Sequence, residues 1–200
     1  MLRSKRLSCA VIRGEKRDIG EDGKVYFIDA SHFLHNAIAG YGWIKRGKVV
    51  EMKTNSGRNR FNVLGAYSPD SGNFLSIEGA EKCDTEMVKK LLIKMRQTNP
   101  GTSRLMGILD NVPYQHAKGV KKLAKKLRIE LLYLPAYSPN LNLIERFWKF
   151  MKKKVARNKY YPTFEEFVAA VQQFLRNLNE YADELKSLMT ENFQLFKAAY

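Results

Sequence analysis

The spacing of hydrophobic and polar residues changes after residue 77. Up to that point, short apolar runs alternate with turn-forming segments rich in glycine, asparagine and proline, as is typical of β-strands. We expect strands at 25–29, 37–43, 49–52, 61–67 and 73–77, and a further short one at 7–12. The first part of the chain therefore predicts a meander of strands.

Beyond residue 84, apolar residues recur every three or four positions, which indicates helices with one buried face. Asp84 is placed to cap the first of these helices, and Thr163 begins a capping box for the last clear one. The helix that follows residue 143 has the inward stripe Ile144, Phe147, Trp148, Met151 and Val155. Strands at 105–109 and 130–134 lie between the helices. Together with the meander, this order predicts an α/β fold, a mixed β-sheet flanked by helices.

Three carboxylates occupy distinctive places in this pattern. Asp29 and Asp110 each follow an apolar, strand-like run, and Glu145 lies near the start of a later helix. Residues at strand ends meet at one edge of a sheet, and the 34 residues between Asp110 and Glu145 suffice to return the chain there. Three converging carboxylates can bind a pair of divalent cations, which suits phosphodiester chemistry. Any one acid, taken alone, is more typical of a helix cap or a solvated carboxylate; the neighbourhoods of Asp110 and Glu145 favour the metal-binding role.

The charge balance points to a polyanionic partner. The chain has 35 lysines and arginines against 20 acidic residues, a net charge of +15. Such an excess attracts nucleic acid or an anionic membrane, but no apolar run approaches the roughly 18 residues of a spanning helix. Two distant cysteines disfavour a disulfide scaffold and a zinc site. We therefore expect DNA as partner, no membrane, and a cytoplasmic, chromosome-associated protein.

Basic residues gather on two of the predicted helices, with few acids among them. The candidate DNA-binding residues are Lys118, Lys121, Lys122, Lys125, Arg146, Lys149, Lys152 and Lys153. The alternative is a solvated lysine face, which the overall charge disfavours. These charges argue for affinity and not for recognition of a DNA sequence.

The segment 134–145, from Leu134 to Glu145, resembles the third-acid motif of DDE transposases of the mariner-like superfamily, particularly their prokaryotic insertion-sequence members. Residues 108–111, followed by His116, resemble the second-acid motif, and residues 27–29 resemble the first. The similarity covers roughly residues 24–178, so we expect that range to form the catalytic domain, with a lead-in at 1–23 and a helical tail at 179–200. Ala30 and Leu143 depart from the usual pattern, and neither removes an expected metal ligand.

The resemblance implies an RNase H-like fold and a metal-dependent endonuclease that cuts transposon ends and transfers strands into target DNA. It implies Asp29, Asp110 and Glu145 as catalytic residues and as ligands of two Mg²⁺ or Mn²⁺ ions. Asn111, His116 and Asn142 are supporting candidates beside these acids, although packing, capping and turn roles are as typical of them.

Two other functions share parts of this evidence. One is an RNase H-like nuclease without strand transfer, and the other is a repurposed, non-catalytic DNA-binding protein. Relatives usually carry an N-terminal helix-turn-helix region that nothing here resembles, so we expect a separate DNA-recognition module as partner. A homodimer is compatible with the handling of two transposon ends together, but no residue specifies it.

Overall fold

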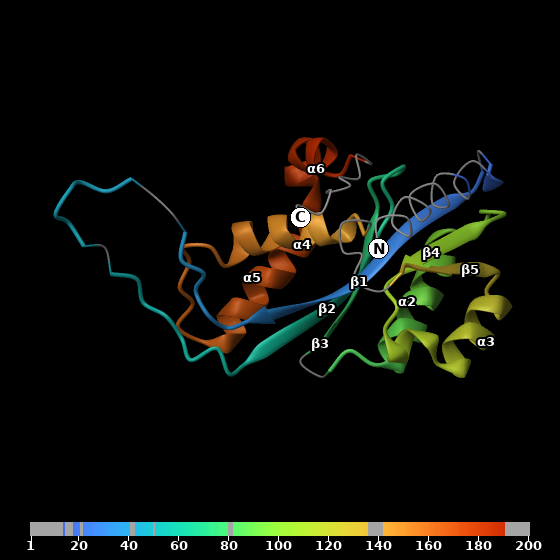
Figure 1. Cartoon of the computed structure of the whole chain (residues 1–200), viewed down its shortest axis with the longest axis horizontal. Helices are drawn as coiled ribbons and strands as arrows, with labels where there is room; N and C mark the ends of the chain where they lie inside the picture. The colour runs from blue at the N-terminus through green and yellow to red at the C-terminus, as the bar shows by residue number, and fades with distance from the viewer. Residues whose placement is uncertain are drawn as a thin grey trace, which may run out of the picture.

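The computed structural model describes residues 14, 18–20, 22–40, 43–49, 51–79, 82–135 and 142–190. The described strands form one five-stranded sheet in the order β3-β2-β1-β4-β5 (Figure 1). Its strands are β1 (Lys24–Leu34), β2 (Arg60–Tyr67), β3 (Phe74–Gly79), β4 (Leu105–Leu109) and β5 (Ile129–Tyr133). The first three are antiparallel neighbours, whereas β4 lies parallel to β1 and β5 parallel to β4. The predicted mixed sheet is confirmed.

Helices lie on both faces of this sheet (Figure 1). They are α2 (Thr85–Thr98), α3 (Lys118–Lys126), α4 (Ile144–Val155), α5 (Phe164–Arg176) and α6 (Ala182–Leu188), with 3₁₀ turns at Pro113–His116 and Leu178–Tyr181. The two predicted caps form, because the Asp84 side chain accepts a hydrogen bond from the Met87 amide and Thr163 accepts one from the Glu166 amide. No helix among the described residues is both long and apolar enough to cross a membrane.

Alternation along the strands divides the interior into two cores. Phe27 and Phe33 of β1 pack on one face with α4, α5 and α6, while Tyr26 and Ile28 pack on the other face with α2 and α3. All five predicted inward residues of α4 are buried. Because Asp29 shares the parity of Phe27, its side chain is directed to the face that α4 covers.

Four of the predictions need correction or lie outside the described residues. The segments 37–43 and 49–52 form no strand where they are described; Ile38 makes only an isolated bridge to Arg157. Their apolar residues Trp43 and Val49 are exposed, so a period-two pattern there reflects no buried face. Asp29 is not at a strand end, because β1 continues to Leu34. The strand predicted at 7–12 lies outside the described residues.

Candidate active site

The three carboxylates singled out in the sequence converge in space. Asp29 comes from β1, Asp110 directly follows β4, and Glu145 is in the first turn of α4. One carboxylate oxygen from each lies within 4.8 Å of the other two, and each residue is partly buried. This is the separation at which three carboxylates can share a cation.

Asp29 reaches this edge although it is inside its strand. The β4 register on β1 runs from Lys24 to Ile28 and stops one residue before Asp29. Beyond that point β1 pairs only with β2, so the side of β1 next to Asp29 is open where β4 turns away at Asp110. The end of the neighbouring parallel strand therefore brings the two aspartates together.

The Trp148 side chain holds Asp29 in place. Its indole Nε1 donates a hydrogen bond of 3.2 Å to Asp29 Oδ2, and the residue is 3% exposed. Edge-on contacts with Phe33, Phe74 and Phe147 fix the indole ring. A hydrogen bond from a packed ring limits the rotation of the carboxylate, as outer-shell partners do for metal ligands.

Gly65 makes room for that indole. It lies opposite Asp29 in the β1–β2 register. A Cβ atom at this position would stand 2.7 Å from Trp148 Cη2 and 2.8 Å from the Phe74 ring. Aromatic rings locked in a core cannot yield as a flexible chain end can. The absence of a side chain at Gly65 of β2 thus lets α4 approach Asp29.

Asn142 fixes the second aspartate from the other side of Glu145. Its Nδ2 donates to Asp110 Oδ1 at 3.3 Å and to the Ile28 carbonyl at 3.2 Å. The Asn142 side chain is 1% exposed, and its Oδ1 has no partner among the described residues. Its backbone carbonyl accepts from the Glu145 amide at 3.2 Å, which ties Asp110 and Glu145 to one turn.

The electrostatics of this cluster favour a bound cation. Burial, together with the neighbouring charges of Asp110 and Glu145, raises the pKa of Asp29 to about 7. Burial also raises the pKa of Asp110, against the hydrogen bond from Asn142. Oxygen donors that repel one another at short range suit a hard divalent cation such as Mg²⁺ or Mn²⁺, which neutralises them. The donor set therefore fits the metal that the sequence predicted.

The other two supporting candidates are Asn111 and His116. Among the described residues, neither forms a side-chain hydrogen bond to one of the three carboxylates. The His116 ring bonds to the Asn111 side chain and stacks on Tyr133, with ring centroids 3.8 Å apart. His116 thus packs against the end of β5. A direct role for either residue stays a prediction.

The predicted DNA-contact residues divide into three groups. Lys118, Lys121, Lys122 and Lys125 are exposed along α3, as are Lys149 and Lys153 on α4. The Lys152 ammonium lies over the Phe33 ring, 5.6 Å from the ring centroid. Arg146 instead donates to the backbone carbonyls of Leu188 and Thr190, which anchors the segment after α6. Contact between any of these residues and DNA stays a prediction.

Sequence reasoning missed the roles of Trp148 and Gly65. Trp148 belongs to the apolar stripe of α4, so its spacing predicts a core residue, which it also is. The available signal was its position three residues after Glu145, which matches that of Asn142 three residues before it. The role of Gly65 depends on the strand register, which the sequence alone does not give.

Comparison with known proteins agrees with this geometry. The model of the family described as DDE superfamily endonuclease matches residues 24–168. The 39 kDa protein of insertion element IS630 from Shigella sonnei is 21% identical over 158 residues, 78% of this chain and 46% of that protein. The chain therefore spans about half the length of this curated relative.

Solved structures share the fold. The catalytic domain of Mos1 mariner transposase has a TM-score of 0.62 at 12% identity and covers 98% of this chain and 95% of its own. The mariner Mos1 paired-end complex with Mg has a TM-score of 0.68 at 12% identity, over 98% of this chain and 63% of the other. The expected RNase H-like fold is confirmed. Because the family model spans most of the chain and includes all three acids, the chain belongs to the DDE superfamily endonuclease family.

Proposed function

We propose that this chain is the catalytic domain of a DNA transposase. It would cut phosphodiester bonds at transposon ends and join the freed 3′ ends to target DNA. The observation that carries this proposal is the convergence of Asp29, Asp110 and Glu145 within 4.8 Å, inside the range matched by the family model.

Asp29, Asp110 and Glu145 would hold the divalent metal, which we propose to be two Mg²⁺ or Mn²⁺ ions. When bound, the metal activates the attacking oxygen and stabilises the leaving oxygen of an in-line displacement. The protein's own contribution is orientation. Trp148 fixes the Asp29 carboxylate, Asn142 fixes that of Asp110, and the first turn of α4 carries Glu145 between them.

The basic surface would supply affinity for DNA. A net charge of +15 and the exposed lysines of α3 and α4 favour contacts with phosphates, which carry no sequence information. Recognition of transposon ends would then come from a separate helix-turn-helix module, and the pairing of two ends from a homodimer. Such a protein acts at the chromosome.

A strand-transfer assay tests the proposal. Purified protein is mixed with Mg²⁺ or Mn²⁺, a short pre-cut duplex and supercoiled plasmid, with Asp110→Ala as the matched inactive variant. We expect joined product from the wild type, a loss of at least about 1,000-fold in the variant, and unchanged DNA affinity, because the metal site is removed while the basic surface stays.

Each other outcome assigns a different function. Metal-dependent nicking without joining would favour a nuclease without strand transfer. DNA binding with neither reaction would favour a non-catalytic DNA-binding protein. Loss of DNA binding together with activity in Asp110→Ala would argue against a metal-ligand role for this residue.

A further inference from the structure

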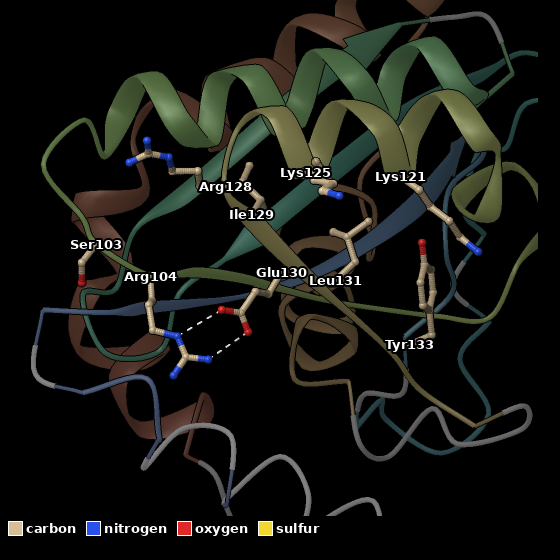
Figure 2. Close-up of a pocket in the computed structure, with 10 residues that line it drawn as sticks. Ser103, Arg104, Lys121, Lys125, Arg128, Ile129, Glu130, Leu131 and Tyr133 are labelled. Carbon is tan, nitrogen blue, oxygen red and sulfur yellow. Dashed lines mark hydrogen bonds and ion pairs between the residues drawn. The ribbon is translucent and has the colours of Figure 1, made fainter.

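A groove runs between α3 and the edge strand β5 (Figure 2). It has a volume of about 440 Å³. Ile129, Leu131 and Ala124 provide apolar surface, and Lys121, Lys125 and Arg128 lie along the α3 side. Among the described strands, only β4 pairs with β5, so the other edge of β5 has no partner strand within the described residues.

Acids among the described residues leave the lysines of this groove without an ion-pair partner. The one carboxylate that lines it, Glu130, is held by Arg104 through two contacts of 3.0 Å (Figure 2). Within the described residues, no carboxylate forms an ion pair with Lys121, Lys125 or Arg128. Unpaired cations along a groove are available to an anionic ligand, which would displace their counterions.

One end of the groove lies at the edge of the sheet from which Asp110 extends. Tyr133 is paired with Leu109 in the β4–β5 register, one residue before Asp110. The His116 ring stacks on the Tyr133 ring. His116 also forms a hydrogen bond with the side chain of Asn111, the residue after Asp110. The Lys121 ammonium lies 5.7 Å from the centre of the same Tyr133 ring. A linear ligand in the groove would therefore reach the edge of the sheet at which Asp110 follows β4.

We propose that the α3–β5 groove binds the phosphate backbone of one DNA strand next to the reacting phosphodiester. β5 extends over about 16 Å, close to the rise of five nucleotides of one strand. Lys121 and Lys125 lie one helical turn apart on the same face, so both can face successive phosphates. The apolar floor suits sugar edges. This inference rests on the proposed DNA substrate and adds where one strand runs.

Two double variants with equal charge change test it. Lys121→Gln/Lys125→Gln removes two cations from the groove. Lys90→Gln/Lys126→Gln removes two exposed cations of α2 and α3 that do not line it. Anisotropy of a labelled duplex is measured in EDTA over a series of salt concentrations. EDTA separates binding from cleavage.

We expect the groove variant to lose about tenfold in affinity, and its dependence of log K on log salt to fall in slope by about 2. The control variant should change by less than about twofold. Equal losses in the two variants would overturn the groove and leave only general surface charge. An unchanged DNA affinity with weaker binding of polyglutamate would overturn it in favour of an acidic peptide.

Failure of the proposed function has a different signature. A wild-type chain that binds DNA with the expected difference between variants, yet never cuts or joins it with Mg²⁺ or Mn²⁺, would contradict the transposase while supporting the groove. A wild-type chain that cuts DNA but shows equal losses in both variants would contradict the groove alone.

Discussion

Helices α3 and α4 are both basic and amphipathic, but they stand in different relations to the site. Both are rich in lysine and bury an apolar stripe, α3 against the core it shares with α2 and α4 against the opposite core. The first turn of α4 contains Glu145, whereas that of α3 contains no acid. Only α4, of the two, also reaches an aspartate, through the Trp148 indole.

This difference separates two kinds of contribution. The apolar stripe of α4 does more than attach the helix to the sheet, because one of its members holds a candidate metal ligand. The stripe of α3 stabilises the fold, and its exposed lysines are what the helix offers to a ligand. A basic amphipathic helix can thus either position the acids of a site or present positive charge to a ligand. The tertiary contacts of its buried side chains determine which of the two roles it has.

The largest expected effect in this comparison is from Trp148→Phe. The ring stays packed while the hydrogen bond to Asp29 is lost, so we expect Mn²⁺ affinity to fall about 10- to 100-fold. Unfolding free energy should fall by only about 1–2 kcal/mol. Titration calorimetry with Mn²⁺ and chemical denaturation measure the two quantities.

Val120→Ala on α3 is the matched variant. Val120 is fully buried, and its truncation should lower the unfolding free energy by about 2 kcal/mol without changing Mn²⁺ affinity. The fully exposed Trp43, changed to Phe, controls for the loss of an indole elsewhere. Equal Mn²⁺ affinity in wild type and Trp148→Phe would contradict the claim that α4, unlike α3, positions a metal ligand.

The acids of the site could be predicted from residue patterns, but the residues that hold those acids in place could not. Asp110 and Glu145 were recognisable from an apolar run, a helix start and a family motif, all of which are local in sequence. The contact between Trp148 and Asp29 joins residues 119 positions apart. Spacing within α4 shows only that Trp148 faces inward, not what it meets there.

The strand predictions succeeded and failed for a related reason. Apolar residues at 61–67 are buried as β2, whereas Trp43 and Val49 in the β1–β2 connection are exposed. Both segments have strand-like composition, but only the first finds a partner strand and a core to cover. Burial is a tertiary property, so composition alone could not separate the two segments.

A second comparison uses one glycine on each face of the sheet. Gly65→Ala on the α4 face would press a methyl group against the Trp148 and Phe74 rings. We expect it to lower the unfolding free energy by about 1–3 kcal/mol and to weaken Mn²⁺ binding as the indole moves from Asp29. Thermal denaturation and calorimetry test both effects.

Gly107→Ala on β4 is its counterpart towards the α2 and α3 core. There the closest atom, at 2.9 Å, is Ile28 Cδ1, the end of a side chain that can change rotamer. We expect a smaller cost, below about 1 kcal/mol, and unchanged Mn²⁺ affinity. Weaker Mn²⁺ binding in Gly107→Ala than in Gly65→Ala would contradict the assignment of the α4 face to the metal site.

The last comparison concerns the free-energy cost of burying the acids themselves. The pKa of Asp29 is raised from 3.8 to about 7 in the folded protein, chiefly by burial. Below pH 3.8 the residue is protonated in both states and contributes no difference. As pH rises from 3.8 towards 7, Asp29 ionises in the unfolded chain but stays protonated in the folded protein. The free energy of unfolding of the metal-free protein therefore falls over that interval and stays lower above it.

Asp29→Asn removes this titration. In EDTA it should unfold at about the same temperature as wild type at pH 4, and be more stable by about 1 kcal/mol or more at pH 8. With saturating Mg²⁺ the order should reverse, because only the wild type gains free energy from the cation. An equal response to pH in both proteins would show that Asp29 is solvated like an ordinary carboxylate. The α4 face would then hold its acids without strain, and the contrast with α3 would rest on Trp148 alone.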